Sequence, residues 1–173
     1  MAASRLKDKY GRVAIIDIDL HHGNGTQAIF YDDPDVLYAS IHADPNICYP
    51  YSSGFADEIG VSAGIGANAN YPLSTGTKID EYLAVLEKMI ATVADFGPKA
   101  VVVSLGFDTF SGDPIGKFSL NVKDFAVIGQ KIATYIKTNN LPCVIVQEGG
   151  YAVNDLPELA RSYFAGFIQG MQI

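Results

Sequence analysis

The stretch VAIIDIDLHHGNG, residues 13–25, joins an apolar run to a cluster of polar side chains. Apart from its two aspartates, the run 13–19 is continuously apolar, which is typical of a parallel strand buried on both faces. Asp17, Asp19 and His21 follow at a spacing of two residues, so strand alternation predicts that all three lie on one face. Carboxylates at the end of a buried strand are costly unless they are paired or bind a metal. The stretch therefore predicts a central strand that leads into a polar site.

Four further segments are rich in Val, Ile and Tyr and are predicted to be strands: 36–42, 69–73, 100–105 and 143–148. Helical patterns fill most of the segments between them, and such alternation indicates βαβ units. We therefore expect a single α/β domain over residues 1–173, with a five-stranded, mainly parallel sheet flanked by helices. The segment 43–68 is the exception, because a loop of this length in a compact domain is usually functional.

Three helices are predicted from apolar residues at three- and four-residue spacing, over 78–96, over 122–138 and from 155–157 onward. Thr77 with Asp80 is the predicted N-cap of the first helix, and Asn121 is that of the second. The last helix is expected to bury a largely aromatic stripe as part of the core: Leu159, Tyr163, Phe164, Phe167 and Ile168.

The composition argues against several classes of partner. The 173-residue chain has a formal net charge of −7 and no run of Lys or Arg, so binding to nucleic acid or to an anionic membrane surface is not expected. No apolar stretch is long enough for a transmembrane helix, and the first residues do not resemble a signal peptide, so a cytoplasmic location is expected. Cys48 and Cys143 form no CxxC pair, which predicts two reduced cysteines and no thiolate zinc site.

Two more strand ends carry polar residues. The segment 100–105 leads into Asp108 and then Asp113, and the segment 143–148 leads through two glycines to Tyr151. Open α/β sheets bind ligands outside the carboxyl ends of their strands, where these residues are expected to meet. Two carboxylates and one imidazole without a thiolate suit a catalytic zinc site with an open position, although other first-row divalent ions also fit. Together with a tyrosine hydroxyl near a developing oxyanion, the pattern indicates metal-assisted hydrolysis of an amide or ester.

Three motifs in this order resemble the histone deacetylase and acetylpolyamine aminohydrolase superfamily: DIDLHHGNGTQAIFY (17–31), GFDTFSGDP (106–114) and EGGY (148–151). Three other stretches look closer to the bacterial acetylpolyamine aminohydrolase-like members: HGNGTQ (22–27), ANYPL (69–73) and DTFSGDPIGKFSL (108–120). The resemblance covers essentially the whole chain, but it matches only the carboxyl-terminal half of the family's catalytic domain. It implies an arginase/deacetylase-like three-layer fold, of which this chain is a part.

The resemblance also implies roles for individual residues. The implied zinc ligands are Asp19, His21 and Asp108. Tyr151 corresponds to the tyrosine that polarises the acetyl carbonyl, and Asp17 corresponds to the aspartate that orients a catalytic histidine. A potassium site is implied whose ligands act mostly through backbone oxygens: Asp17, Asp19, His21, Ser40 and Ile41. The residues implied to line the acyl-lysine tunnel are Tyr49, Ile115 and Gly149.

The family's general base is a pair of adjacent histidines in a GHH motif upstream of the zinc-binding strand, and no residue before Val13 matches it. His21 and His22 are not that pair, since the first matches a metal ligand and the second a residue packed beside it. His42 is interpreted as a structural residue at a strand end. Asn24 stands where many relatives have an aspartate, which implies a different tuning of the histidine pair.

The family sheet has eight parallel strands, and the five expected here would form a contiguous part of it. The expected spatial order, by residue range, is 143–148, 100–105, 13–19, 36–42 and 69–73. The segment 143–148 would then be an edge strand with an uncovered apolar face, and such edges tend to associate. We therefore expect the chain to self-associate through this edge or to bind a partner there.

The leading interpretation is a zinc-dependent deacetylase-type amidohydrolase that converts acetylated polyamines, similar small N-acetyl amines or acetyl-lysine to the amine and acetate. Without the upstream half, this chain is expected to turn over slowly or not at all. One alternative is a non-catalytic module that binds metal or oligomerises through its edge. Another is a binuclear manganese hydrolase of the arginase type, but Phe110 stands where the D-x-D-x-x-D ligand pattern of that class requires a carboxylate.

Overall fold

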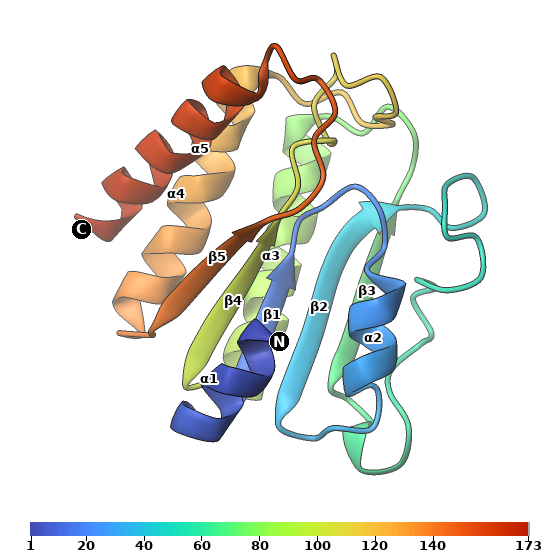
Figure 1. The fold of residues 1–173 in the computed structure, drawn as a ribbon, viewed down its shortest axis with the longest axis vertical. Coiled ribbons are helices and arrows are strands. Elements are labelled where there is room, and N and C mark those ends of the chain that lie inside the picture. Colours follow the sequence, from blue (N-terminus) through green and yellow to red (C-terminus); the bar gives the residue numbers. More distant parts are fainter. Residues whose placement is uncertain (173) are drawn as a thin grey trace.

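A five-stranded parallel sheet forms the centre of the molecule, with the strands in the order β3-β2-β1-β4-β5 (Figure 1). The computed structural model describes residues 1–172. The strands are β1 (Val13–Asp17), β2 (Val36–Ala43), β3 (Asn68–Leu73), β4 (Ala100–Leu105) and β5 (Cys143–Gln147). The five predicted strands and their expected spatial order are confirmed.

Helices cover both faces of the sheet, which gives the three layers that were expected. The helices are α1 (Ala2–Tyr10), α2 (Asn24–Phe30), α3 (Ile79–Phe96), α4 (Val122–Thr138) and α5 (Leu156–Met171). In Figure 1, α1 and α2 lie in front of the sheet, α3 lies behind it, and α4 and α5 lie side by side next to β5. Alternate residues of β1 follow this division, since Ala14 and Ile16 pack in the core below α3–α5, whereas Val13 and Ile15 pack towards α1.

The three predicted helices are present, but one of their predicted caps is wrong. Asn121 caps α4, and the Asp124 carboxylate accepts a hydrogen bond from the Asn121 backbone N–H at 2.8 Å. The N-cap of α3 is Lys78 rather than Thr77. The Thr77 hydroxyl instead donates to the carbonyl oxygen of Ser74 at 2.8 Å, so it stabilises the preceding turn.

The core prediction for α5 is wrong at two positions. Leu159 and Tyr163 are buried and Phe167 is half-buried, but Phe164 and Ile168 are exposed. The reason is that α5 contacts α4 along a narrow stripe, in which Gly166 lies against the Ala126 backbone with no room for a Cβ. Only one side of α5 is therefore covered among the described residues.

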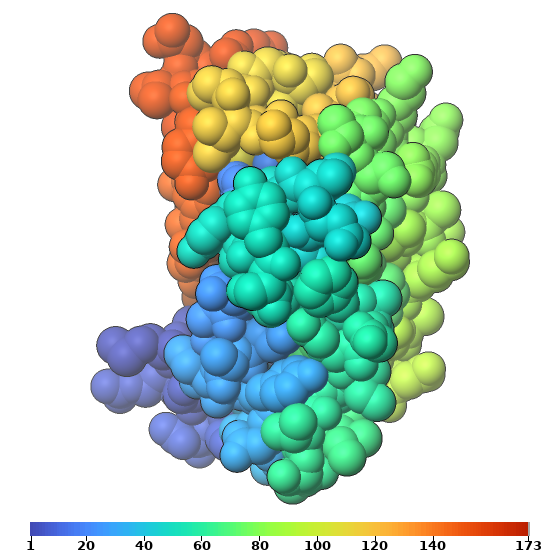
Figure 2. Space-filling model, turned by 90° about the vertical axis from the view of Figure 1, so that its right-hand side faces the viewer, coloured from blue at the N-terminus to red at the C-terminus, as the bar shows by residue number. Residues whose placement is uncertain are grey.

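The segment 44–67 joins β2 to β3 and contains one short 3₁₀-helix, Ser62–Gly64. Figure 2, in which this segment is cyan to green, shows it at the centre of one face of the molecule, next to α2 and to the yellow segment that follows β4. It therefore lies beside the carboxyl ends of the strands. Within residues 1–172, no helix is both long enough and apolar enough to span a membrane.

Candidate metal centre

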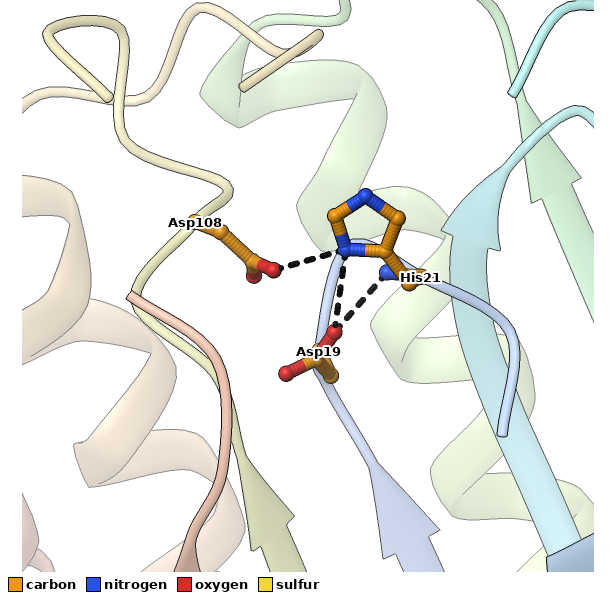
Figure 3. A group of neighbouring side chains, drawn as sticks. All are labelled: Asp19, His21 and Asp108. Atoms are coloured by element: carbon orange, nitrogen blue, oxygen red, sulfur yellow. Dashed lines mark hydrogen bonds and ion pairs between the residues drawn. The ribbon is translucent and has the colours of Figure 1, made fainter. Parts of the chain in front are cut away.

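Asp19, His21 and Asp108 converge at the carboxyl ends of β1 and β4 (Figure 3). One potential ligand atom from each residue lies within 4.8 Å of the other two. The His21 Nδ1 atom lies 2.9 Å from Asp108 Oδ2 and 3.6 Å from Asp19 Oδ1. Asp108 is fully buried, Asp19 is buried and His21 is half-buried, so the cluster opens towards solvent mainly at the imidazole.

Backbone N–H groups hold both carboxylates in place. The Leu20 N–H donates to Asp108 Oδ1 at 2.9 Å, and the Gly149 N–H donates to Asp19 Oδ2 at 2.7 Å. Each aspartate thus has one oxygen held by a distant backbone N–H and the other turned towards the imidazole, and this second oxygen of Asp19 also accepts the His21 backbone N–H. Since groups that orient metal ligands also tune metal affinity, this arrangement prepares the pair for a cation.

The reason given above for the convergence is only partly right, because β1 ends at Asp17 and regular strand alternation does not extend to His21. Turn hydrogen bonds replace it. The Asp19 N–H donates to Asp17 Oδ1 at 3.1 Å, and the His21 N–H donates to Asp19 Oδ1 at 2.9 Å. These side-chain-to-backbone bonds, typical of aspartate after a strand, turn the chain so that Asp19 and His21 face Asp108.

Charge and space both favour a cation at this cluster. Hydrogen bonds from His21 to Asp108 and then Asp19 raise the pKa of the imidazole to about 10, so without a metal the site is an ion-paired imidazolium. Two carboxylate oxygens and one imidazole nitrogen form the mixed O/N donor set that catalytic zinc uses. A Cβ at Gly149 would collide with both Asp108 Oδ2 and Asp19 Oδ2, so glycine is required beside the two carboxylates. The residues present therefore fit a divalent metal ion.

The metal centre lies in an open cavity of about 590 Å³. Residues from several loops line this cavity: Asp17, Asp19, His21, Gly23, Thr26, Tyr49, Ser104, Ile115, Glu148, Gly149 and Tyr151. The three residues predicted to line the tunnel, Tyr49, Ile115 and Gly149, are among them. Tyr151, which follows β5, also lines the cavity. Burial first, and then the charges of Asp108 and Asp19, raise the pKa of the Tyr151 phenol, so the phenol is protonated at neutral pH and can donate a hydrogen bond.

Asp17 is buried at the end of β1, beside the metal centre. Its Oδ2 atom accepts a hydrogen bond from the Tyr38 hydroxyl at 3.0 Å. Burial, followed by the charge of Asp19, raises the pKa of Asp17 to about 7. Ser40 pairs with Asp17 in the β1–β2 register, and Ile41 follows it, both fully buried. The residues predicted for a potassium site thus lie around the carboxyl-terminal end of β1 and in β2 beside it.

The other two histidines do not line the cavity. Nε2 of His22 lies 2.9 Å from Gln27 Oε1, and burial lowers the pKa of His22 to about 4. Nε2 of His42 donates to the Gly54 carbonyl oxygen at 2.8 Å, and its Nδ1 accepts from the Ser40 hydroxyl at 2.8 Å. The two rings pack edge-on at 4.6 Å between centroids. Both histidines are neutral and structural.

A set of buried polar side chains around these histidines was not identified from the sequence. This buried polar network consists of His22, Gln27, His42, Glu58, Asn68 and Asn70. Gln27 Nε2 donates to Glu58 Oε2 at 2.7 Å, and the Gly54 N–H donates to the same oxygen at 2.7 Å. The network thereby ties the segment 44–67, which carries Tyr49, to α2 and β3. The available sequence signal for this network was the pair Asn68 and Asn70. These residues are two positions apart in a strand, so their carboxamides lie on one face.

Comparisons with known proteins agree with this fold. The histone deacetylase domain family matches residues 1–167. Acetylpolyamine amidohydrolase 1 of Pseudomonas aeruginosa is 47% identical over 156 residues, which is 90% of this chain and 44% of that protein. The acetylpolyamine amidohydrolase of Mycoplana ramosa is 45% identical over 157 residues, which is 90% of this chain and 45% of that protein.

A solved structure gives the same result. The crystal structure of acetylpolyamine aminohydrolase from Burkholderia pseudomallei matches with a TM-score of 0.93 and 41% identity, covering 98% of this chain and 48% of that one. The chain thus spans about half the length of these relatives. Since the family match extends over nearly all of its residues and the fold agrees, the chain belongs to the histone deacetylase domain family.

Proposed function

We propose that this chain forms the zinc-binding part of a deacetylase-type amidohydrolase that hydrolyses an N-acetyl amine to the amine and acetate. The supporting observation is that an imidazole and two carboxylates converge in a cavity that Tyr151 also lines. A zinc ion bound there would supply Lewis-acid polarisation of the acetyl carbonyl and lower the pKa of the attacking water.

In this proposal each side chain has a separate task. Asp19, His21 and Asp108 hold the ion, and the backbone N–H groups on the two aspartates keep the ligands oriented. The protonated Tyr151 phenol donates a hydrogen bond to the oxyanion that develops on the acetyl carbonyl. Asp17, whose carboxylate the Tyr38 hydroxyl holds, would orient a general-base histidine that is none of the three histidines of this chain.

The proposed substrates are acetylated polyamines or similar small acetylated amines, and then acetyl-lysine. Tyr49 and Ile115 provide aromatic and apolar wall for an aliphatic chain. The exposed carboxylate of Glu148 at the same cavity, and the net charge of −7, favour a substrate with a cationic amine. Two relatives named above are acetylpolyamine amidohydrolases, which supports the same substrate class.

Slow turnover is expected for the isolated chain. Of its three histidines, only His21 lines the cavity, and it belongs to the proposed ligand set. His22 and His42 are buried in the polar network and cannot accept a proton from water in the cavity. General acid–base help is worth about 10²–10⁴-fold, so its loss would reduce turnover by a similar factor.

The proposal is tested by measuring zinc content and acetate release from N-acetylputrescine and from an acetyl-lysine peptide. The wild-type chain is expected to bind one zinc ion and to release acetate. Asp108→Ala should lose both properties, whereas Tyr151→Phe should keep zinc and lose turnover. Asp95→Ala, at an exposed position near the end of α3, is the matched control and should keep both.

Two outcomes separate the alternatives. Stoichiometric zinc without any acetate release would favour a metal-binding module over an enzyme. A folded chain that binds no zinc would refute the proposal.

We also propose that the chain self-associates through β5. This strand is at the edge of the sheet and pairs only with β4 among the described residues. Val144 pairs with Val102 on the side of the sheet that α1 covers, yet Val144 is 39% exposed. An apolar, unpaired edge favours pairing with another chain.

Light scattering across a range of protein concentrations tests this proposal. The wild-type mass should rise above the monomer mass of 18.6 kDa, and Val144→Lys should shift the chain towards the monomer. A wild-type monomer at every concentration would contradict it.

A potassium site is proposed at Asp17, Ser40 and Ile41, with backbone oxygens of Asp19 and His21. The buried Asp17 carboxylate has the Tyr38 hydroxyl and the Asp19 N–H as its hydrogen-bond donors, and a nearby cation would offset the cost of its burial. The melting temperature should be higher in potassium chloride than in choline chloride at equal ionic strength. Equal melting temperatures would refute the site.

A further inference from the structure

Asp113 joins the segments that follow β4 and β5, both of which contribute residues to the cavity. Its Oδ2 atom accepts hydrogen bonds from the Tyr151 N–H at 2.6 Å and the Ala152 N–H at 3.1 Å. Its Oδ1 atom accepts from the Ile115 N–H at 3.0 Å. Asp113 is buried, and no ion pair involves it among residues 1–172. Three backbone donors therefore offset the cost of burying this carboxylate.

The side chain of Tyr151 has little packing to fix it. Tyr151 is 50% exposed, so packing does not hold the phenol. The two preceding residues are glycines, and Gly150 has a φ of 134°, a conformation that side-chain-bearing residues rarely adopt. Other hydrogen bonds hold the residues on either side, since the Gly149 carbonyl oxygen accepts from the Phe107 N–H and the Ala152 carbonyl oxygen accepts from the Asp155 N–H. At Tyr151 itself, the hydrogen bond from its N–H to Asp113 is the restraint on the backbone.

We infer that Asp113 is a positioning residue for Tyr151 and Ile115, and that it fixes the oxyanion donor relative to the neighbouring apolar wall of the cavity. The inference rests on the proposed function for its catalytic consequence, but the placement of Tyr151 can be measured without turnover. A displacement of about 1 Å in a reacting group can cost about 10²-fold in rate. Loss of Asp113 should therefore act on catalysis through Tyr151 and leave the metal ligands in place.

The test uses the full chain with Tyr151 replaced site-specifically by 3-fluorotyrosine and followed by ¹⁹F NMR at slightly acidic pH. The resonance of the otherwise wild-type chain should differ from that of the urea-unfolded chain. Asp113→Asn and Asp113→Ala should move it towards the unfolded position. Asp124→Ala is the matched control, because Asp124 is equally buried and accepts a backbone N–H at 2.8 Å, but at the start of α4. It should lower the melting temperature and leave the resonance unchanged.

An unchanged ¹⁹F resonance in Asp113→Asn, with or without a lower melting temperature, would overturn the inference. Where the wild-type chain releases acetate, Asp113→Asn should lower kcat by about 10²-fold with zinc affinity changed less than about threefold, and the double variant with Tyr151→Phe should be no slower than Tyr151→Phe alone. A shifted resonance in Asp113→Asn, combined with no acetate release by the wild type, would uphold the positioning role and count against the proposed function.

Discussion

The two adjacent histidines of the stretch HH (21–22) lie in regions with opposite electrostatics. His21 belongs to the metal centre, where Asp108 and Asp19 raise its pKa to about 10. His22 belongs to the buried polar network, where burial lowers its pKa to about 4. The metal centre holds unbalanced carboxylates beside an open cavity, whereas the network is closed and its histidines are neutral. Whether a histidine can bind a metal therefore depends on the partners that surround it. His21 meets Asp108 after β4, whereas His22 meets Gln27 in α2.

The largest expected effect is that of Gly149→Ala on the metal centre. The new methyl group would collide with Asp108 Oδ2 and Asp19 Oδ2. Since disturbing only the groups that orient metal ligands costs about 10–100-fold in affinity, zinc affinity should fall by more than about 100-fold. Competition with a chromogenic chelator measures it.

Gly25→Ala is the matched control for that substitution. A Cβ at Gly25 in α2 meets no atom within 4 Å, and alanine favours a helix. Zinc affinity should be unchanged in this variant. Equal losses in the two variants would mean that the metal does not lie between the two carboxylates.

The next largest effect concerns the buried polar network at acidic pH. Burial, and then the charge of His22, lower the pKa of His42 from 6.5 to about 4. Above pH 6.5 His42 is neutral in both the folded and the unfolded state, so it does not affect stability there. As the pH falls from 6.5 towards 4, only the unfolded state binds the proton, and the fold loses up to about 3 kcal/mol of stability. His42→Gln, which keeps a donor for the Gly54 carbonyl oxygen, should remove that part of the acid sensitivity.

Urea unfolding of the metal-free wild type and variant at several pH values measures the difference. Asp17, with a pKa raised from 3.8 to about 7, changes stability in the opposite direction over the same range, but it does so in both proteins. The difference between the two slopes therefore isolates His42. Parallel curves would show that His42 is not held neutral.

The smallest expected effect is the pH dependence of zinc binding. Release of one proton on binding changes the binding free energy by about 1.4 kcal/mol per pH unit. In the metal-free protein His21 is protonated up to a pKa of about 10, and a metal ligand must be deprotonated. Apparent zinc affinity should thus rise about tenfold per pH unit between pH 7 and 9. Calorimetry in two buffers of different ionisation enthalpy should detect one released proton. An affinity independent of pH would exclude His21 as the ligand.

Much of the fold could be predicted because its signals are local. The apolar runs in β1 and β4 and the stripes of α3 and α4 report burial directly. The helix α1 was not predicted, since AASRLKDKY (2–10) has few apolar residues and becomes helical against the sheet. Phe164 and Ile168 were placed in the core because a stripe shows which side of α5 is apolar, but not how much of it is covered.

The site was predictable where chemistry and strand ends coincide, as at Asp19, His21 and Asp108. It was not predictable where function depends on what lies between loops. Glu58 bonds to Gln27, 31 residues earlier, and Asp113 bonds to Tyr151, 38 residues later. No local sequence pattern predicts such contacts. These carboxylates accept hydrogen bonds from backbone N–H groups and from amides far away in the sequence, and they belong to no recognisable motif.

The central claim is that one divalent cation joins Asp19, His21 and Asp108. Anomalous diffraction at the zinc edge from crystals of the zinc-loaded chain tests it most directly. We expect one strong anomalous peak at about 2.0–2.2 Å from His21 Nδ1 and from a carboxylate oxygen of each aspartate. A peak at any other residues, with these three side chains still paired as in the metal-free protein, would contradict it.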